Sequence, residues 1–250
     1  MTAPPELRTR RVLLALAAGG VDPASLRSSV QLAAGLSVEL EALFLEDADL
    51  FTSSTLPFAR EILPSGAERP VAEESLSGSL RAQAETLRQQ LARQADPARI
   101  KWSFRTLRAR RVSALLELSA GPDVVVAAWQ RRMRWQAAPG VRPLARPVVL
   151  AYQSSEPPAG ALEIAERLAR DRGTELVLLG PPDGASLAVE AGLQVRRLVR
   201  TDSSLAALST VLATLSAEML VLPAAELAAC EPLEIGRLFD AVAVPVVLVR

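Results

Sequence analysis

Few side chains in this chain of 250 residues could carry out acid–base or nucleophilic chemistry. The chain has no histidine, which excludes histidine as a general base, as a metal ligand and as the activator of a serine or cysteine nucleophile. Its one cysteine, Cys230, can form neither an intramolecular disulfide nor a thiolate metal site on its own. A helix start beside Cys230 could lower the pKa of its thiol, but we favour a buried, inert thiol. These features predict that the protein is not an enzyme.

Three acidic residues, Glu46, Asp47 and Asp49, gather where a predicted strand ends. A single Mg²⁺ ion that kept several waters would need few ligands beyond such carboxylates. Acids at the entrance of a loop are more often solvated or helix-capping, and no second acidic cluster can be placed opposite them. Lys101, the only lysine, lies outside any glycine-rich turn, which excludes a Walker A phosphate loop. We therefore expect no metal and no cofactor.

The overall composition is that of a globular protein. Half of the residues are hydrophobic, 22% are charged, and the formal net charge is zero. This balance excludes a disordered tail protein and a uniformly basic nucleic-acid binder. The longest apolar run without charge, residues 203–217, is shorter than the roughly 20 residues that span a bilayer. Because a lone cysteine fits a reducing compartment, we expect a cytoplasmic protein that does not enter a membrane.

Positive charge gathers in residues 99–146, which hold 11 lysine and arginine residues and two acidic ones. Within this segment arginines are interleaved with tryptophans, namely Trp129, Arg131, Arg132, Arg134 and Trp135. Such side chains could grip phosphates or stack on the bases of a single-stranded nucleic acid. A solvated arginine face whose tryptophans cover a sheet edge explains the same pattern, and we favour it. We therefore expect no nucleic acid, although the segment could take an anionic ligand or a protein partner.

The chain contains an internal repeat. At an offset of 136 residues, Leu14 and Ala15 align with Leu150 and Ala151. The same offset aligns Leu26 with Leu162, Leu32 with Leu168, Ala33 with Ala169, Glu39 with Glu175 and Leu40 with Leu176. Later in the chain the best offset falls to about 93–95, so the second half lacks some 43 residues that correspond to a stretch within 47–95. We assign the two unequal units to residues 1–146 and 147–250.

Short apolar runs alternate with helical patterns in each half. Continuous valine- and leucine-rich runs between helices are typical of strands that are covered on both faces, and hence of mostly parallel sheets. Residues 46–70 have the composition of a loop. The expected strands are 12–16, 38–45, 100–107, 124–128, 148–152, 175–179, 193–199, 219–222 and 244–249. The expected helices are 23–34, 73–95, 112–120, 158–171, 203–217 and 232–242, and the long one at 73–95 has no counterpart in the second half.

Several segments carry a family resemblance. They are the strand–helix openings 12–35 and 148–173, the sequences LFLED at 43–47 and LPFARE at 56–61, and the closing strand 244–249. In these segments, and over nearly its whole length, the chain resembles the universal stress protein family in tandem form. The resemblance implies a three-layer α/β fold, of the adenine nucleotide alpha hydrolase-like type, with a five-stranded parallel sheet per unit. It also implies a cytoplasmic, stress-associated protein that is non-catalytic or weakly catalytic.

Some members of that family bind ATP in the crevice at the carboxyl ends of the strands, and this chain departs from their motifs. Those members have an aspartate at the end of the first strand, where this chain has Ala17 and Gln153. They also have a glycine-rich phosphate loop after the fourth strand, where no glycine occurs here until Gly140 and Gly236. Non-glycine side chains obstruct the close approach of a triphosphate. We therefore expect a binding or scaffold protein that lacks standard ATP binding.

A nucleotide-binding stress sensor for ATP or AMP is the alternative. Backbone amides at the N-termini of helices near Ser154 and Asp202 could hold an anion, and Gln153, Ser154 and Ser155 would then contact the nucleotide. Ser154 and Ser155 are also explained as a capping turn ahead of Pro157 and Pro158, which is the interpretation we favour.

The first half lacks room for a fifth strand of its own, so one strand could serve both units. The apolar strand at the chain end, which includes Val246, Val247 and Leu248, is expected to lie at a sheet edge because nothing follows to cover it. Bare edges invite pairing. We therefore expect a homodimer joined through this strand, with a monomer whose halves close on each other as the alternative.

Overall fold

The computed structural model describes residues 11–18, 21, 23–62, 66–119, 123–128, 146–183, 192–242 and 244–250. The elements of the first half are β1 (Arg11–Ala17), α1 (Pro23–Leu36), β2 (Glu39–Asp47), α2 (Ala48–Ser54), β3 (Arg60–Ile62), β4 (Glu68–Pro70), α3 (Glu73–Ala95), β5 (Trp102–Ala109), α4 (Arg111–Ser119) and β6 (Val124–Ala128). Those of the second half are β7 (Val148–Ala151), α5 (Ala159–Arg172), β8 (Leu176–Gly180), β9 (Val195–Val199), α6 (Leu205–Leu215), β10 (Met219–Pro223), α7 (Ala224–Ala228), α8 (Pro232–Ala241) and β11 (Val246–Val249).

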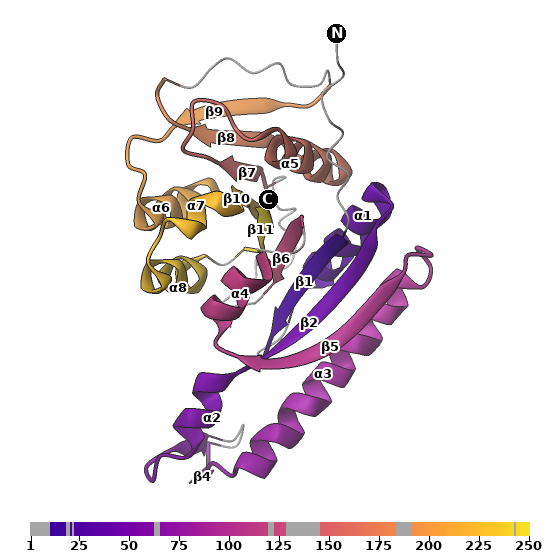
Figure 1. Ribbon diagram of the computed structural model, residues 1–250, viewed down its shortest axis with the longest axis vertical. Coiled ribbons are helices and arrows are strands. Elements are labelled where there is room, and N and C mark those ends of the chain that lie inside the picture. The colour runs from indigo at the N-terminus through magenta and orange to yellow at the C-terminus, as the bar shows by residue number, and fades with distance from the viewer. Residues whose placement is uncertain are drawn as a thin grey trace.

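Nine of the strands form one sheet that passes through both halves, with helices on its two faces (Figure 1). The strand order is β5-β2-β1-β6-β11-β10-β7-β8-β9. All described pairings in this sheet are parallel except that between β11 and β6. The expected three-layer α/β architecture with mostly parallel strands is confirmed. The helices between the strands make this parallel order possible, because the chain must run back along the sheet before it can start a second strand in the same direction.

The strand register preserves the sequence repeat. Ala15 of β1 lies opposite Leu43 of β2, and Ala151 of β7 lies opposite Leu179 of β8, so both strand pairs keep the offset of the sequence alignment. The later strands keep the smaller offsets: β5 matches β9 in register, and β6 matches β10. The strands at 12–16 and 148–152 therefore occupy equivalent positions in the two units.

The place of β11 corrects one expectation. It was expected at a sheet edge, but it lies in the interior of the sheet, parallel to β10 on one side and antiparallel to β6 on the other. Val246, Val247 and Leu248 are accordingly almost fully buried. The first unit has four strands in this sheet, and the last strand of the second unit fills the fifth position beside β6. The open edge that motivated a homodimer through 244–249 is therefore absent, while the oligomeric state stays a prediction.

Apolar side chains alternate between the two faces of the sheet, as strands covered on both sides require. Leu14 and Leu16 of β1 pack toward α1, α3 and α5, whereas Leu13 and Ala15 pack toward the layer of α4, α6, α7 and α8. The long helix α3 has the bounds expected from its periodicity and buries its apolar stripe against the first layer. That stripe consists of Leu80, Ala84, Leu87, Leu91 and Ala95.

A side-chain contact also ties the units together on the α1 and α5 layer. The guanidinium of Arg172, in the last turn of α5, donates hydrogen bonds to the hydroxyl of Ser28 in α1 and to the carboxylate of Glu218. The division at residue 146 is thus a boundary in sequence, across which both the sheet and this contact continue.

The structure also bears on membrane insertion. Among the described residues, no helix combines the length and the apolar character that crossing a membrane requires.

Candidate functional site

Polar side chains from three segments of the second unit meet at the carboxyl end of β7. On one side of β7 the sheet continues through β8 and β9, and on the other through β10 and β11, so the strand order reverses at this point. Ligands of open α/β sheets bind in the crevice outside the carboxyl ends of strands at such a reversal. We therefore describe the residues that meet here.

Gln153 connects three of the strand ends. The backbone N–H of Tyr152 donates to Leu179 and continues the pairing with β8, which leaves Gln153 just past the end of β7. The backbone N–H of Gln153 donates to Glu226 Oε1 at 2.7 Å, and its side-chain amide donates to the Ser203 carbonyl at 3.4 Å. Because Glu226 lies in α7, directly after β10, the first bond spans the reversal point.

Ser154 and Ser155 form a local turn. The Ser154 hydroxyl donates to the carbonyl of Glu156, and both serines are exposed. The helix that follows, α5, begins at Ala159 with Pro158 as its N-cap and has no side-chain cap bond. The serines therefore make a turn ahead of the prolines without capping the helix.

Arg200 is the best-buried charged side chain at this end of the sheet, with 8% of its surface exposed. Its Nε donates to the carbonyl of Asp202 at 2.7 Å, and its Nη2 donates to the carbonyls of Ser203 and, at 2.9 Å, Ser204. Burial lowers the pKa of Arg200, and the negative charges of Glu226 and Asp202 oppose that shift. Its Nη1 is buried and has no hydrogen-bond partner among the described residues. The guanidinium thus holds the loop between β9 and α6 in place.

Side chains at the N-terminus of α6 accept hydrogen bonds from its first backbone N–H groups. Asp202 Oδ1 accepts a hydrogen bond from the Ser204 backbone N–H at 2.8 Å, and Ser204 Oγ accepts one from the Ala207 N–H at 3.2 Å. The hydrogen bonds from Ser204 lower the pKa of Asp202. Ser204 has the extended backbone and side-chain acceptor typical of an N-cap. These two amides, which a bound anion would need, already have acceptors.

The Glu226 carboxyl has a pKa close to neutral pH. Burial raises its pKa from 4.5 to about 7, against the opposing effects of the Gln153 N–H and the charge of Arg200. Nearby, the thiol of Cys230 donates to the backbone carbonyl of Glu226 at 3.2 Å. Burial, with the negative charges of Glu234 and Glu226, raises the pKa of Cys230. This direction is opposite to that of a thiol activated by a helix N-terminus.

The corresponding end of the first unit is apolar at the strand and charge-paired around it. Ala17, which ends β1, is buried. Asp47 caps α2 by accepting from the Asp49 N–H at 3.1 Å, and it also accepts from Arg111 Nε at 2.7 Å. Asp49 pairs with Arg110 at 3.1 Å.

Acidic side chains of β2 also pair with arginines of the neighbouring strand β5. Glu46 pairs with Arg108 at 3.3 Å, and Glu41 pairs with Arg105. Of the three acids expected to be solvated or capping, Asp47 caps α2, and Glu46, Asp47 and Asp49 are each paired with an arginine. In the described part of the basic segment, Arg105, Arg108, Arg110 and Arg111 are the partners of these acids, so much of the charge there is neutralised within the fold.

Two other sets of site residues were predicted from the sequence. Trp129, Arg131, Arg132, Arg134 and Trp135 all lie outside the described residues. Val246, Val247 and Leu248 lie inside the sheet, as described above. Among the described residues, no group of three or more His, Cys, Asp or Glu side chains is arranged to hold a metal ion.

Sequence reasoning singled out Gln153, Ser154 and Ser155 but missed Arg200 and Glu226. The sequence around each of these two residues nevertheless contained a hint that the residue is buried. Arg200 directly follows the apolar pair Leu198-Val199 and precedes the capping sequence Asp202-Ser203-Ser204, and Glu226 is a lone acid in an alanine- and leucine-rich stretch. A lone charge in an apolar stretch indicates a buried, partnered group, because burial of an unpaired charge is costly. The identity of the partner cannot be read from the sequence, because Glu226 and Gln153 are 73 residues apart and only the fold brings them together.

Neither a protein-family model nor a curated protein matches the sequence of the chain. Solved structures do align with it. A universal stress protein from Archaeoglobus fulgidus DSM 4304 is 13% identical, with a TM-score of 0.46, and the alignment covers 95% of this chain and 96% of that chain. A protein of the universal stress protein family from Burkholderia pseudomallei is 12% identical, with a TM-score of 0.37 and coverage of 70% and 98%.

A functionally unknown protein from Pseudomonas aeruginosa PAO1 is 12% identical, with a TM-score of 0.43 and coverage of 96% and 92%. Values this low carry no argument about ligand or activity. The likeness expected from the sequence is thus found again among solved structures, and the chain resembles universal stress proteins in fold alone.

Proposed function

We propose that the protein is a universal stress protein-like binding or scaffold protein of the cytoplasm that is not an enzyme and lacks standard ATP binding. The observation that carries the proposal is the hydrogen bond from the Gln153 backbone N–H to the Glu226 carboxylate. The stress-related role rests on the sequence resemblance alone.

Electrostatics opposes the binding of phosphate at the reversal point. A nucleotide phosphate at the reversal point would need backbone N–H groups as donors, and the Gln153 N–H already has a carboxylate acceptor. When ionised, that carboxylate repels a phosphate: two like charges about 4 Å apart cost about 4 kcal/mol at the effective dielectric of a protein surface. The side chain therefore occupies the place of an anion and opposes a second one.

The alternative function, a nucleotide sensor that uses helix N-termini, would have to displace existing hydrogen bonds. The N-terminus of α6 would have to release Asp202 and Ser204 before its amides could bind phosphate. The Ser154 hydroxyl is likewise engaged with Glu156. Each of these internal bonds would have to be replaced by a bond to the ligand, which lowers the net gain from binding.

The test is a measurement of bound and added nucleotide. Mass spectrometry of the purified protein is expected to find no retained nucleotide. Calorimetry with Mg²⁺-ATP and with AMP is expected to give no stoichiometric binding in the micromolar range. Stoichiometric micromolar binding of either nucleotide would overturn the proposal in favour of the sensor.

A matched pair of variants separates the effect of the Glu226 charge from the effect of its hydrogen-bond acceptor. Glu226→Gln keeps an acceptor for the Gln153 N–H and removes the charge, whereas Glu226→Ala removes both. Glu226→Gln should relieve only the repulsion, whereas Glu226→Ala should also leave the Gln153 N–H free, so nucleotide affinity should rise from wild type to the Gln variant and again to the Ala variant. Equal binding by wild type and both variants would contradict the role given to Glu226.

A further inference from the structure

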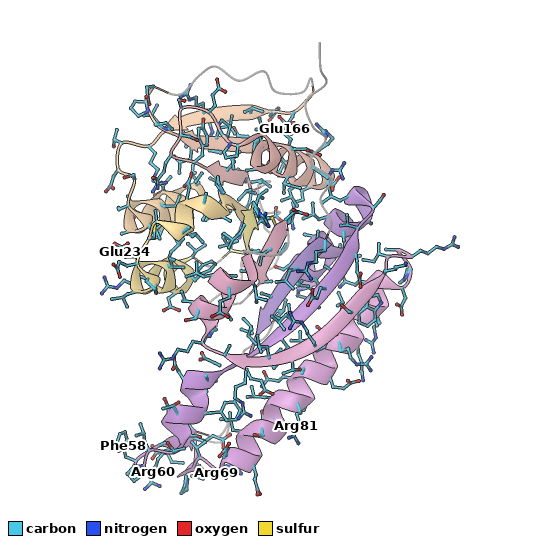
Figure 2. All side chains as sticks on the ribbon, viewed as in Figure 1. Phe58, Arg60, Arg69, Arg81, Glu166 and Glu234 are labelled. Atoms are coloured by element: carbon cyan, nitrogen blue, oxygen red, sulfur yellow. The ribbon has the colours of Figure 1, made fainter. Side chains whose placement is uncertain are left out.

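The exposed apolar side chains of the described surface gather in one place. Of the six large hydrophobic residues that are exposed on the described surface, four lie between the start of α2 and the end of β3: Leu50 in α2, Leu56 and Phe58 in the turn that follows it, and Ile62 in β3. Phe58 and Ile62 are 74% and 72% exposed. We call residues 48–62 and 66–70 the distal lobe. Figure 1 shows it beside the N-terminal end of α3, at the end of the molecule away from the second unit, and Figure 2 shows Phe58, Arg60 and Arg69 together there.

The distal lobe is not needed to complete either sheet unit. It falls in the stretch that the sequence repeat omits from the second half, and β3 and β4 form a separate two-stranded sheet. A two-stranded ribbon is at best marginally stable by itself in water. The lobe is nevertheless anchored to the body, because Phe51 of α2 is buried and the Arg108 guanidinium of β5 lies 3.5 Å from the centre of its ring.

The charges of the distal lobe are of both signs and nearly balanced, with two arginines and three carboxylates. Arg69 pairs with Glu61 at 2.8 Å across the ribbon. Arg60 and Glu68 make no ion pair among the described residues, and both are exposed. A surface of one charge would repel an identical surface, whereas this one offers an unpaired cation and an unpaired anion beside the apolar side chains.

From these observations we propose that the distal lobe is the interface of a homodimer, in which the lobes of two copies of this chain pack on each other about a two-fold axis with Phe58 in the contact. A two-fold contact presents the same patch twice, so it can set Arg60 of one copy near Glu68 of the partner while burying the apolar side chains. It would also cover the outer edges of the β3–β4 ribbon, beside which no further strand lies among the described residues. The proposal concerns a surface remote from the Gln153–Glu226 junction, so its failure leaves the proposed function untouched.

The experiment is light scattering coupled to size-exclusion chromatography at tens of micromolar. Wild type is expected to elute at twice the chain mass of 26.6 kDa. Phe58→Asp and Ile62→Asp are each expected to elute as monomers with unchanged far-UV circular dichroism. Leu233→Asp, which alters a residue of α8 that is 66% exposed, is the matched control and should remain a dimer. If Phe58→Asp loses secondary structure, Ile62→Asp decides the question.

Three outcomes would overturn the proposal. The first is a wild-type monomer at every concentration, and the second is a dimer that survives both lobe substitutions. The third is a monomer that pellets with phosphatidylglycerol vesicles in a Phe58-dependent manner, since a lipid surface would then be the occupant of the lobe.

Discussion

Val247 of β11 lies opposite Val126 of β6, at the antiparallel pairing that joins the two units into one sheet. On its other side Val247 lies opposite Val221 of β10. The chain end is therefore held between strands of both units. The pairing continues past the strand, where the Arg250 backbone N–H donates to the Asp123 carbonyl at 3.0 Å.

Replacement of Val247 by proline should destabilise the whole protein. Proline removes a backbone donor and is tolerated in sheets only at edges and bulges, so the free energy of unfolding should fall by about 3 kcal/mol or more. Urea denaturation followed by circular dichroism measures this loss.

Val199→Pro is the matched control, since β9 is an edge strand. The Arg200 N–H donates to Gly180 of β8, so the alternate N–H of Val199 points away from β8. A loss in Val199→Pro as large as that in Val247→Pro would contradict the interior position of β11.

Glu226→Gln should stabilise the protein at pH 8 but not at pH 5. Burial raises the pKa of Glu226 in the folded protein to about 7, from the ordinary value of 4.5. Between these values the folded state binds more protons than the unfolded state, so this group lowers the free energy of unfolding as the pH rises toward and through 7. Because the side chain is partly exposed, the gain at pH 8 should be on the order of 1–2 kcal/mol.

The measurement is chemical denaturation of wild type and Glu226→Gln at a series of pH values. The stability difference should shrink steadily toward pH 5. A difference that stays constant across the series would show that the charge of Glu226 has no part in it.

Gly180→Ala should destabilise the protein because of the neighbouring Tyr152. A methyl group at Gly180 would overlap the ring and hydroxyl of Tyr152, which lies in the apolar core. Overpacking of this kind costs about 1–3 kcal/mol. Thermal unfolding measures the effect.

Gly78→Ala is the opposite case and serves as its comparison. This glycine lies within α3 and has open space around the added methyl group, so the substitution should stabilise the helix by about 0.5–1 kcal/mol. A loss of stability in both variants would point away from the Tyr152 contact as the cause.

Arg200→Met should loosen the loop between β9 and α6. The guanidinium donates to the carbonyls of Asp202, Ser203 and Ser204, and the apolar side chain would remove these hydrogen bonds, at a cost of about 1–3 kcal/mol. Arg200→Lys should recover only part of that loss, because an ammonium group lacks the fork geometry of the guanidinium. Hydrogen exchange of the Ala207 amide reports on the loop, and full protection in Arg200→Met would contradict the prediction.

Much of the local structure follows from the sequence by itself. The apolar spacing of Leu80, Leu87 and Leu91 suffices to place α3, because one face of a helix must be buried to be stable. The offset between Ala15 and Ala151 likewise predicts equivalent strands, since repeated apolar patterns fold into repeated units. The loop expected at 46–70 instead contains α2 and the β3–β4 ribbon, elements too short for periodicity to reveal.

The tertiary structure decided the neighbours of those elements. An apolar run such as that of β11 shows that both faces of the strand are covered, yet it carries no information about which strands lie beside it, because backbone hydrogen bonds are the same for any neighbour. The contact between Gln153 and Glu226 was likewise decided by the tertiary structure. Their residue types are visible in the sequence, but only the parallel order of β7 and β10 brings the two strand ends together, and only burial there raises the pKa of the Glu226 carboxylate.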